Sequence, residues 1–357
     1  MSYNSTHIMQ LPRKVIVGNN ILKNCGMFIT DSISNAKKIA IMTGPRVKDK
    51  VSGLIENSLS ECNLEFEWII AQEASFQFAD EITTLLKGKG ISLIIGLGGG
   101  RCIDLGKLIA NRLQISFISI PTSASHDGIS SPFVSLKGNE RPYSIMTETP
   151  LEIICDLEVI SNAPYRLLAS GCGDLIAKTT AVKDWELARD FNNEYFGEYA
   201  AKLAFLGSRM IIDISKEITK SEKTDEITRT IVEGLISSGV AAGIAGSSRP
   251  CSGSEHLFSH ALEYITKNKC GLHGERVGIG TIIMAKLHGL DWREIRLALK
   301  RIGCPITCKD ISVDKDQMIE AMFLARKIRP ERFTILNKIE MSRMRYQEIF
   351  SELGILD

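Results

Sequence analysis

The chain has 357 residues, and its 43 lysine and arginine residues stand against 42 acidic residues, so its formal net charge is +1. With 44% hydrophobic and 24% charged residues, the composition excludes a mainly disordered chain and a strongly basic protein that binds nucleic acid or anionic membranes. The length predicts two domains or one large domain.

The chain ends and the cysteines indicate where the protein resides. Residues 1–7 are polar and lack the apolar segment of a secretory signal, and no apolar run approaches the length of a membrane-spanning helix. We therefore expect no stable membrane insertion. The nine cysteines are scattered, and the close pair Cys304 and Cys308 lacks a second pair to complete a zinc site. Reduced, mostly buried thiols are typical of a cytoplasmic protein, and we expect that location.

Short, continuously apolar runs in the first 120 residues predict buried strands, and amphipathic stretches between them predict helices. The expected strands are 39–43, 66–71, 92–95 and 115–120, and the expected helices are 47–62, 78–87 and 102–113. This alternation predicts βαβ units and a parallel sheet covered on both faces. Residues 126–150 are rich in Gly, Pro and Ser and predict a loop or a hairpin, and 151–157 predict one more strand.

After about residue 160 the pattern becomes helical. Long stretches with apolar residues three and four apart predict helices at 164–190, 194–219, 224–246, 254–267, 275–288, 291–302 and 315–328. We predict an α/β domain over residues 1–160 and an all-helical domain over residues 161–357. A cleft between two such domains is a preferred place for a ligand.

A glycine-rich turn joins the third predicted strand to the next helix. Four of the five residues 96–100 are glycine, and Arg101 stands where the usual dinucleotide fingerprint has its third glycine. The turn is either a phosphate-binding turn at a helix N-terminus or a tight connection without a ligand. Its position at the carboxyl end of a strand favours the phosphate site. The hydroxyl-rich residues 122–125 follow the next strand and are expected at the same sheet edge.

Three of the six histidines, His256, His260 and His273, fall within 18 residues. With Ser254 as the expected N-cap, His256 and His260 lie on one face of a helix. Two imidazoles and a carboxylate can hold zinc or iron(II) and leave a position open for substrate. Asp174, expected at the start of a helix, is the candidate carboxylate. Taken singly, each histidine also fits a hydrogen-bonded structural role, and Asp174 also fits a helix N-cap.

Five motifs in chain order resemble those of archaeal sn-glycerol-1-phosphate dehydrogenases. These are Gly-Gly-Gly…Asp (98–104), Thr-Ser-Ala-Ser-His-Asp-Gly (122–128), Gly-Cys-Gly-Asp (171–174), Ser-Gly-Ser-Glu-His-x-x-Ser-His (252–260) and His-Gly-Glu (273–275). That family belongs with glycerol dehydrogenases, iron-containing alcohol dehydrogenases and dehydroquinate synthases. The resemblance covers residues 10–350. It implies a nucleotide-binding α/β domain, a helical metal domain, and reduction of dihydroxyacetone phosphate to sn-glycerol 1-phosphate, the backbone of archaeal ether lipids.

The resemblance also implies roles for individual residues. It makes Asp174, His256 and His273 the metal ligands, and it places Asp127, Asp174 and His260 at the substrate, with His260 and Asp127 in the catalytic step. We expect NAD or NADP as cofactor, zinc ahead of iron(II), a small phosphorylated substrate, and a homo-oligomer. The implied cofactor contacts are Gly98, Gly99, Gly100, Arg101, Cys102, Thr122, Ser123, Ala124, Ser125 and Ser131.

The partner of the substrate phosphate is not assigned by these motifs. The family pattern leads us to expect a basic residue near Phe133, which this sequence lacks, so Lys137, Arg141 and Arg249 are candidates on charge alone. The alternative functions are a glycerol dehydrogenase acting on unphosphorylated substrate, a non-catalytic zinc-stabilised binding protein, and a protein whose glycines and histidines are structural. A dehydroquinate synthase is disfavoured, because the basic residues that its carboxylate substrate requires cannot be placed.

Overall fold

The first half of the chain builds a six-stranded sheet in which every neighbouring pair is parallel, in the order β1-β8-β5-β4-β2-β3. The computed structural model describes residues 6–34, 36–137, 142–218 and 224–356. The strands of the sheet are β1 (Lys14–Gly18), β2 (Lys38–Thr43), β3 (Glu65–Ile70), β4 (Leu93–Gly98), β5 (Ser116–Pro121) and β8 (Glu152–Asp156). Five of the six are the strands that the sequence predicts. The sixth, β1, is a partly exposed strand at the sheet edge, and its apolar run, residues 15–17, is only three residues long.

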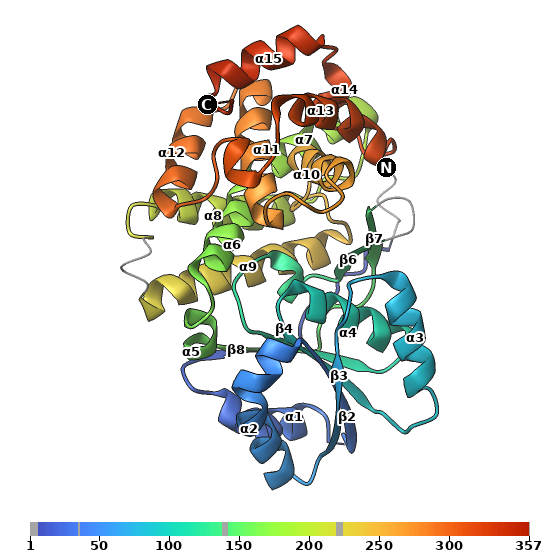
Figure 1. Ribbon diagram of the computed structural model, residues 1–357. Coiled ribbons are helices and arrows are strands. Elements are labelled where there is room, and N and C mark those ends of the chain that lie inside the picture. The colour runs from blue at the N-terminus through green and yellow to red at the C-terminus, as the bar shows by residue number, and fades with distance from the viewer. Residues whose placement is uncertain (1–5, 35, 138–141, 219–223, 357) are drawn as a thin grey trace.

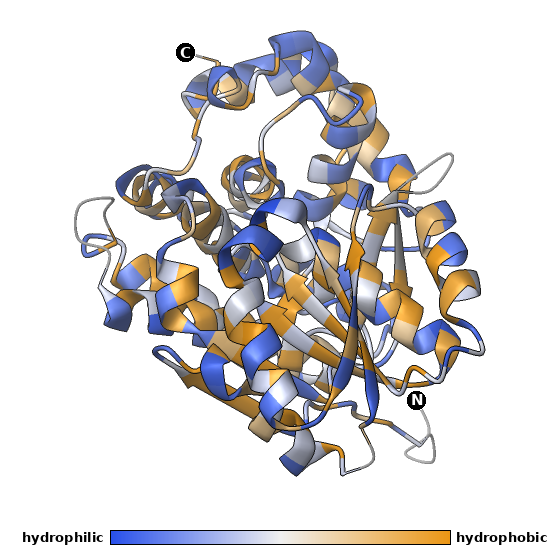
Figure 2. Cartoon of the chain, turned by 60° about the horizontal axis from the view of Figure 1, so that its bottom comes forward, coloured by the Kyte–Doolittle hydropathy of each residue, from blue (hydrophilic) through white to orange (hydrophobic). Residues whose placement is uncertain are grey.

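Helices cover both faces of this sheet (Figure 1). They are α1 (Cys25–Ser32), α2 (Pro45–Glu61), α3 (Phe76–Leu86), α4 (Gly100–Leu113) and α5 (Leu157–Ser161). One apolar cluster joins α1 and α2 to one side of the strands, and a second, larger cluster includes α3 and α4 on the other side. In Figure 2 the strands form an apolar centre, and the outer faces of the helices are polar.

A hairpin occupies part of the segment expected to be a loop or a hairpin. Strands β6 (Phe133–Lys137) and β7 (Pro142–Met146) pair antiparallel, apart from the main sheet. The hairpin contacts α4 on the side that faces the helical half of the chain (Figure 1).

From Leu157 onward, the described part of the chain contains helices and no strand, as predicted. The longer helices are α6 (Tyr165–Ile176), α7 (Lys178–Asn192), α8 (Glu198–Asp213), α9 (Asp225–Ala245), α10 (Ser254–Ile265), α11 (His273–His288), α12 (Trp292–Ile302), α13 (Lys315–Ile328) and α15 (Arg343–Glu352), with the short α14 (Ile335–Lys338) before the last. The single helix predicted over 164–190 is wrong in one respect: the chain is interrupted at Ala177, and α6 and α7 are separate helices. A continuous apolar pattern does not reveal such a break.

Helix α9 is long and apolar enough to cross a membrane by length and composition. Its most apolar window is 56% buried inside the protein, and the core helix of a globular protein passes the same test. Figure 1 shows α9 running across the molecule between the sheet half and the helical half, where it packs against α5, α6 and α8.

The apolar core is continuous between the two halves. The larger cluster runs from β2 and β4 through α4 into α6, α9, α10, α11 and α13. The N-terminal segment also bridges the halves, because His7 Nε2 lies 2.6 Å from the carbonyl oxygen of Ile244 and the Gln10 N–H donates to the carbonyl of Gly243 in α9. The domain boundary near residue 160 therefore remains a prediction.

Candidate metal and cofactor site

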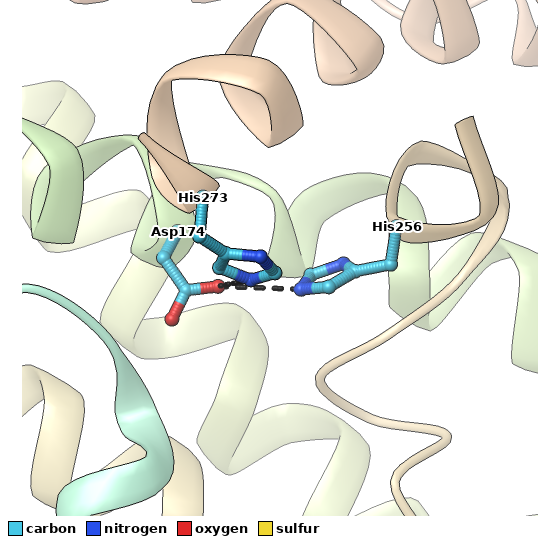
Figure 3. A group of neighbouring side chains, drawn as sticks. All are labelled: Asp174, His256 and His273. Carbon is cyan, nitrogen blue, oxygen red and sulfur yellow. Dashed lines mark ion pairs between the residues drawn. The ribbon is translucent and has the colours of Figure 1, made fainter. Parts of the chain in front are cut away.

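Three side chains from three helices converge in the helical half of the molecule (Figure 3). One ligand atom from each of Asp174, His256 and His273 lies within 4.8 Å of the others. His256 Nε2 is 3.3 Å from Asp174 Oδ1, and His273 Nε2 is 3.9 Å from the same oxygen. Asp174 lies within α6, near its carboxyl end, so the expectation of a helix start and the N-cap alternative are both wrong.

Close backbone contact between α6 and α11 brings Asp174 and His273 together. A Cβ on Gly173 would lie 2.3 Å from the carbonyl oxygen of Gly274, and one on Gly274 would lie 1.8 Å from the carbonyl oxygen of Ser170. The Gly274 N–H also donates to Ser170 Oγ at 3.1 Å. A larger residue at either glycine would separate the helices. The glycines therefore set the distance between the two candidate ligands.

A buried carboxylate orients the other histidine. Glu255 Oε1 lies 2.7 Å from His256 Nδ1, which leaves Nε2 directed at Asp174. The same carboxylate accepts the Gly253 N–H at 2.6 Å and the Thr180 hydroxyl at 2.8 Å. Carboxylates that hold the second nitrogen of a metal-binding histidine are a common feature of metal sites, because they fix its tautomer and orientation.

Helix α10 starts at Ser254, as predicted, but the N-cap role expected for Ser254 is wrong. Gly253 is the N-cap, and Ser254 is the first helical residue. Both the N–H and the hydroxyl of Ser254 donate to Asp184 Oδ2, each at 2.6 Å. Asp184 is fully buried in α7, and Ile335 and His288 contact its other oxygen. The Ser254 hydroxyl, which was expected to cap its own helix, thus binds the carboxylate of Asp184 in another helix.

Asp174 and His273 favour the protonation states that bind a metal, whereas His256 does not: burial opposes its charge, but its hydrogen bonds to Asp174 and Glu255 raise its pKa. Burial opposes the charge on Asp174, but the charge of Lys178 and the hydrogen bond and charge of His256 outweigh it and hold the pKa of Asp174 well below its usual range. Burial and the charge of His256 lower the pKa of His273 well below its usual range, so this imidazole is neutral at neutral pH. An ionised carboxylate and a neutral imidazole are the forms that bind a metal. The set of two nitrogens and one oxygen fits zinc or iron(II) with a free coordination position.

A buried lysine that the sequence patterns did not point to joins this group to Asp127. Lys178 is fully buried at the start of α7. Its Nζ donates to Asp174 Oδ1 at 2.8 Å, to Asp127 Oδ2 at 2.7 Å and to the carbonyl of Cys251 at 3.2 Å. The Asp127 N–H donates to Asp174 Oδ2 at 3.0 Å. The signal in the sequence is the i, i+4 spacing of Asp174 and Lys178, which places both on one side of the chain across the α6–α7 junction.

One cavity of about 360 Å³ connects the metal group with the sheet edge. His256, His273, Asp127 and His260 all line it. His260 lies one turn after His256 on α10 and is 8% exposed. Among the described residues its Nδ1 has no hydrogen-bond partner, and Glu263 Oε2 is 3.7 Å away. Burial, with smaller effects from the charges of His256 and Arg329, lowers the pKa of His260, so the side chain is neutral.

The glycine turn is a strand–turn–helix connection at the carboxyl end of β4. Gly98 has φ +148°, a conformation that favours glycine, and Gly99 is the N-cap of α4. The first amides of α4, at Gly100 and Arg101, precede the first intrahelical donors and are available to an anion. The helix begins two residues earlier than predicted. The Thr122 N–H donates to the carbonyl of Gly98 at 3.0 Å, so the segment after β5 lies beside the turn, as expected.

The ten expected cofactor residues divide into three groups in the structure. Those lining the cavity are Gly100, Arg101, Ser125 and Ser131. Gly98, Gly99, Thr122 and Ser123 lie beside them in the same turn and the neighbouring segment, where Ser123 Oγ would be 3.6 Å from a Cβ on Gly99. The side chains of Cys102 and Ala124 are buried, so a cofactor can reach these two residues through their backbone alone.

Lys107 is a second buried lysine that the sequence patterns did not point to. It is 1% exposed on α4, and its Nζ donates to the carbonyls of Gly128, Ser131 and Phe133 at 2.7–3.1 Å. On the same helix, Asp104 Oδ2 accepts the Ser135 N–H at 3.0 Å. The loop that carries Asp127 and Ser131 is therefore fixed to α4, close to the glycine turn.

Three residues were suggested by charge alone as partners of the substrate phosphate, and the structure describes the side chain of one of them, Arg249. Arg249 is buried and forms a two-pronged ion pair with Glu194, and its Nη1 also donates to the carbonyl of Phe333. That guanidinium is committed to a structural role, so the suggestion is wrong. Arg141 and the side chain of Lys137 lie outside the part of the chain that the structure describes.

The chain is similar to known proteins along most of its length. Residues 16–164 match the family model described as iron-containing alcohol dehydrogenase. A protein of Nitrosopumilus maritimus named glycerol-1-phosphate dehydrogenase [NAD(P)+] is 46% identical over 337 residues, 94% of each chain. A protein of the same name from Hyperthermus butylicus is 45% identical over 332 residues, covering 93% of this chain and 94% of that one.

Solved structures share the fold. Glycerol dehydrogenase from Schizosaccharomyces pombe superposes with a TM-score of 0.81 at 20% identity, over 98% of this chain and 91% of that one. Maleylacetate reductase from Agrobacterium tumefaciens superposes with a TM-score of 0.75 at 15% identity, over 99% of this chain and 100% of that one. At these identities the likeness concerns the fold alone. The full-length relatives, the two-part architecture and the site geometry lead to one conclusion: the chain belongs to the glycerol-1-phosphate dehydrogenase family.

Proposed function

We propose that this protein reduces dihydroxyacetone phosphate to sn-glycerol 1-phosphate, with NADH or NADPH as the hydride source. The observation that carries the proposal is one cavity that joins an open three-ligand metal group to a glycine turn at the end of a parallel strand. A metal group with three protein ligands suits catalysis, whereas a purely structural zinc site has four. The names of the full-length relatives support the same reaction.

The proposed reaction needs two groups besides the protein chain, a divalent metal ion and a nicotinamide cofactor. A divalent ion held by Asp174, His256 and His273 would polarise the substrate carbonyl, as a Lewis acid. A nicotinamide whose diphosphate rests on residues 98–102 would supply the hydride. We propose zinc ahead of iron(II), because nitrogen and carboxylate donors in an open set of three suit zinc in catalytic sites.

The protein's own residues orient the substrate. Asp127 is 20% exposed at its side chain, lines the cavity, and is held by Lys178 and by its own N–H on Asp174. Its outer carboxylate oxygen can therefore accept a hydrogen bond from the C1 hydroxyl of the substrate without the side chain moving. Fixing a reactant in this way removes part of the entropic barrier to reaction.

His260 is the proposed proton donor. The reduced carbonyl oxygen must gain a proton, and the imidazolium form of His260, on the cavity wall, can deliver one directly or through a water and return to the neutral form that its lowered pKa favours. Glu263 Oε2, 3.7 Å from Nδ1, stabilises the ring when it holds a second proton. We assign Asp127 to orientation, since one of its carboxylate oxygens already accepts a hydrogen bond from Lys178 Nζ.

The remaining assignments rest on family likeness. We propose a nucleotide-binding α/β domain over residues 1–160 and a metal- and substrate-binding helical domain over residues 161–357, in a cytoplasmic homo-oligomer. The product would be the glycerol phosphate backbone of archaeal ether lipids. The buried thiols are consistent with a reducing compartment.

A substrate comparison tests the reaction. Zinc-loaded protein is assayed for NADH and NADPH oxidation with dihydroxyacetone phosphate and, separately, with dihydroxyacetone, and the phosphorylated product is analysed for handedness. We expect a strong preference for the phosphorylated ketone and a product that is sn-glycerol 1-phosphate. Preference for dihydroxyacetone, or formation of the sn-3 isomer, would contradict the proposal.

A further inference from the structure

His126 is a cavity residue that the proposed reaction does not use. It lies on the loop after β5 that also carries Asp127, and it lines the cavity beside the glycine turn. The family motifs imply roles for its neighbours Ser125 and Asp127 but none for His126 itself. The surroundings of its two ring nitrogens indicate what this side chain does.

One ring nitrogen of His126 is occupied by the protein itself. The Gly128 N–H donates to His126 Nδ1 at 2.8 Å, within the same short turn. A ring nitrogen that accepts a hydrogen bond carries no proton, so the neutral ring holds its proton on Nε2 and is a donor there. Within the described ranges of the chain, Nε2 makes no hydrogen bond. The ring therefore presents one fixed N–H donor that the protein leaves unused.

The ring of His126 lies against the first residue of α4. A Cβ on Gly100 would be 1.8 Å from His126 Nε2 and 2.5 Å from its Cδ2, and a Cβ on Gly128 would be 2.6 Å from its Cε1. A side chain at either glycine would therefore displace the ring. The last glycine of the turn thus makes room for the protein's own histidine, whose Nε2 lies at the N-terminus of the helix.

N–H donors from two segments meet at this point of the cavity wall. The amides of Gly100 and Arg101 have no acceptor within α4, and the helix dipole makes this end of the helix positive. The Nε2–H of His126 adds a donor from the loop after β5. Converging N–H groups at the start of a helix are the usual environment of a bound phosphate group. The arrangement therefore fits an anion that has several oxygens.

The acidic side chain in this part of the cavity has partners of its own. Asp104 lines the cavity from α4, and its Oδ2 accepts the Ser135 N–H at 3.0 Å. Its Oδ1 is 3.9 Å from Lys107 Nζ and would be 3.5 Å from a Cβ on Gly128. The carboxylate thus lies on the side of the histidine ring that faces Gly128, whereas Nε2 faces the start of α4.

We propose that His126 is a further cofactor-binding residue, whose Nε2–H donates to a diphosphate oxygen of NADH or NADPH at the start of α4. The inference rests on the proposed function, because that function requires the cofactor. Gly128 is the positioning residue, since its N–H keeps the proton of the ring on Nε2. A hydrogen bond to a charged acceptor is stronger than one between neutral groups, so its loss should weaken cofactor binding.

Two substitutions at His126 separate the roles of its ring nitrogens. Asparagine keeps an acceptor at the distance of Nδ1 for the Gly128 N–H and removes the donor at Nε2, whereas glutamine keeps a donor at the distance of Nε2. NADH binding to zinc-loaded protein without ketone is measured by nicotinamide fluorescence. His126→Asn should raise the Kd for NADH about tenfold or more, and His126→Gln should raise it less. His126→Ala carries the same expectation as His126→Asn should the latter fail to fold.

The same substitutions at His7 are the matched controls. His7 is exposed, does not line the cavity and contacts the carbonyl oxygen of Ile244. His7→Asn and His7→Gln should bind NADH as the wild type does.

A fragment of the cofactor locates the contact. ADP-ribose contains the diphosphate and lacks nicotinamide, and its Kd is measured by displacement of NADH. His126→Asn should weaken ADP-ribose and NADH by the same factor. At saturating NADH, its KM for dihydroxyacetone phosphate should remain that of the wild type, because the ketone binds at the metal group.

The outcomes distinguish this contact from the reaction. Wild-type affinity for NADH in His126→Asn, or weaker binding in His126→Gln than in His126→Asn, would overturn the proposal, because the ring would then serve only the Gly128 contact. Weaker NADH binding with unchanged ADP-ribose binding would overturn the diphosphate assignment, and a raised KM for the ketone alone would assign His126 to the substrate. A wild type that binds NADH but does not reduce dihydroxyacetone phosphate would refute the proposed function and leave the binding comparison valid.

Discussion

At the scale of single residues, His260 lies near the three candidate metal ligands but has a different carboxylate as its neighbour. It shares a helix face with His256 but has Glu263 as its neighbour in place of Asp174. His260→Ala should keep stoichiometric zinc and lower kcat by about 100-fold or more, because proton transfer by a positioned side chain contributes 10²–10⁴-fold. Elemental analysis and steady-state kinetics on the same sample check this. Loss of zinc in proportion to activity would instead make His260 a ligand.

Lys178 is the residue whose removal the protein should tolerate least. Lys178→Met leaves Asp127 and Asp174 buried beside each other without their shared cation. Removing one partner of a buried ion pair costs about 3–5 kcal/mol, so a large fall in the free energy of unfolding is expected for the metal-free protein. Zinc should restore part of it, because the ion neutralises Asp174, one of the two carboxylates. Denaturant unfolding with and without zinc measures both effects.

Lys183→Met is the matched control for Lys178, since Lys183 lies on the same helix, is 40% exposed at its side chain and pairs with Glu186 on the surface. Exposed pairs contribute about 0–1 kcal/mol, so this variant should unfold almost as the wild type does. Equal destabilisation by the two substitutions would show that the buried position of Lys178 has no special importance.

The residues of the site were only partly predictable from the sequence. The metal-ligand set could be predicted, because its residues stand in motifs that are readable along the chain. The role of Lys178 could be predicted only in part, because its spacing from Asp174 is readable but its second partner, Asp127, comes from a segment that meets it only in the folded protein. Arg249 was a wrong candidate for the same reason: charge alone does not reveal that Glu194 is its partner.

At the scale of elements, the contact between α6 and α11 determines the metal site. Gly173→Ala places a methyl group 2.3 Å from the carbonyl oxygen of Gly274, so one helix must shift. We expect about 1–3 kcal/mol of destabilisation, as for other overpacked sites, and weaker zinc binding, because Asp174 and His273 move apart. Melting temperature and a zinc competition assay with a chelator provide the two readouts.

Gly53→Ala is the control for this substitution. Gly53 is exposed in α2, and a Cβ there meets nothing within 4 Å. Replacing such a helical glycine should stabilise the protein by about 0.5–1 kcal/mol without affecting zinc. If Gly173→Ala also leaves zinc affinity unchanged, the close approach of the helices is unimportant for the site.

Element order was largely predictable from the sequence, and element ends were not. The apolar runs that became β2, β4, β5 and β8 are buried strands with a strong pattern, and β3 is a partly exposed edge strand that the sequence also predicted. The break at Ala177 was missed, and Ser254 was wrongly expected to be the N-cap of α10, because its N–H and hydroxyl bind the distant carboxylate of Asp184 rather than capping the helix locally.

At the scale of the whole molecule, the cysteines report how tightly the chain packs. Seven of the nine are buried, and Cys62 and Cys270 are partly exposed. Burial raises the pKa of Cys25 to about 11 and that of Cys304 to about 12. Since the thiolate is the reactive form, about one Cys25 thiol in a thousand is reactive at a pH three units below its pKa. The native protein should therefore be alkylated by iodoacetamide at Cys62 and Cys270 first, as mass spectrometry of peptides would show. Rapid labelling of Cys155 or Cys172 would contradict the described packing.

Two properties of the whole molecule remain predictions. The homo-oligomeric state can be measured by light scattering. The division near residue 160 can be tested by limited proteolysis, although the continuous apolar core and the contacts of residues 7 and 10 with α9 hold the two halves together.

The central claim is that dihydroxyacetone phosphate is reduced with the help of a metal held by Asp174, His256 and His273. The most direct measurement is a titration of metal-stripped protein with zinc, in which oxidation of NADH by dihydroxyacetone phosphate is recorded at each step. Activity should be absent at the start, rise in proportion to zinc, and level off at a single ion per chain, with no rise in His256→Ala. Full turnover by the stripped protein would contradict the account.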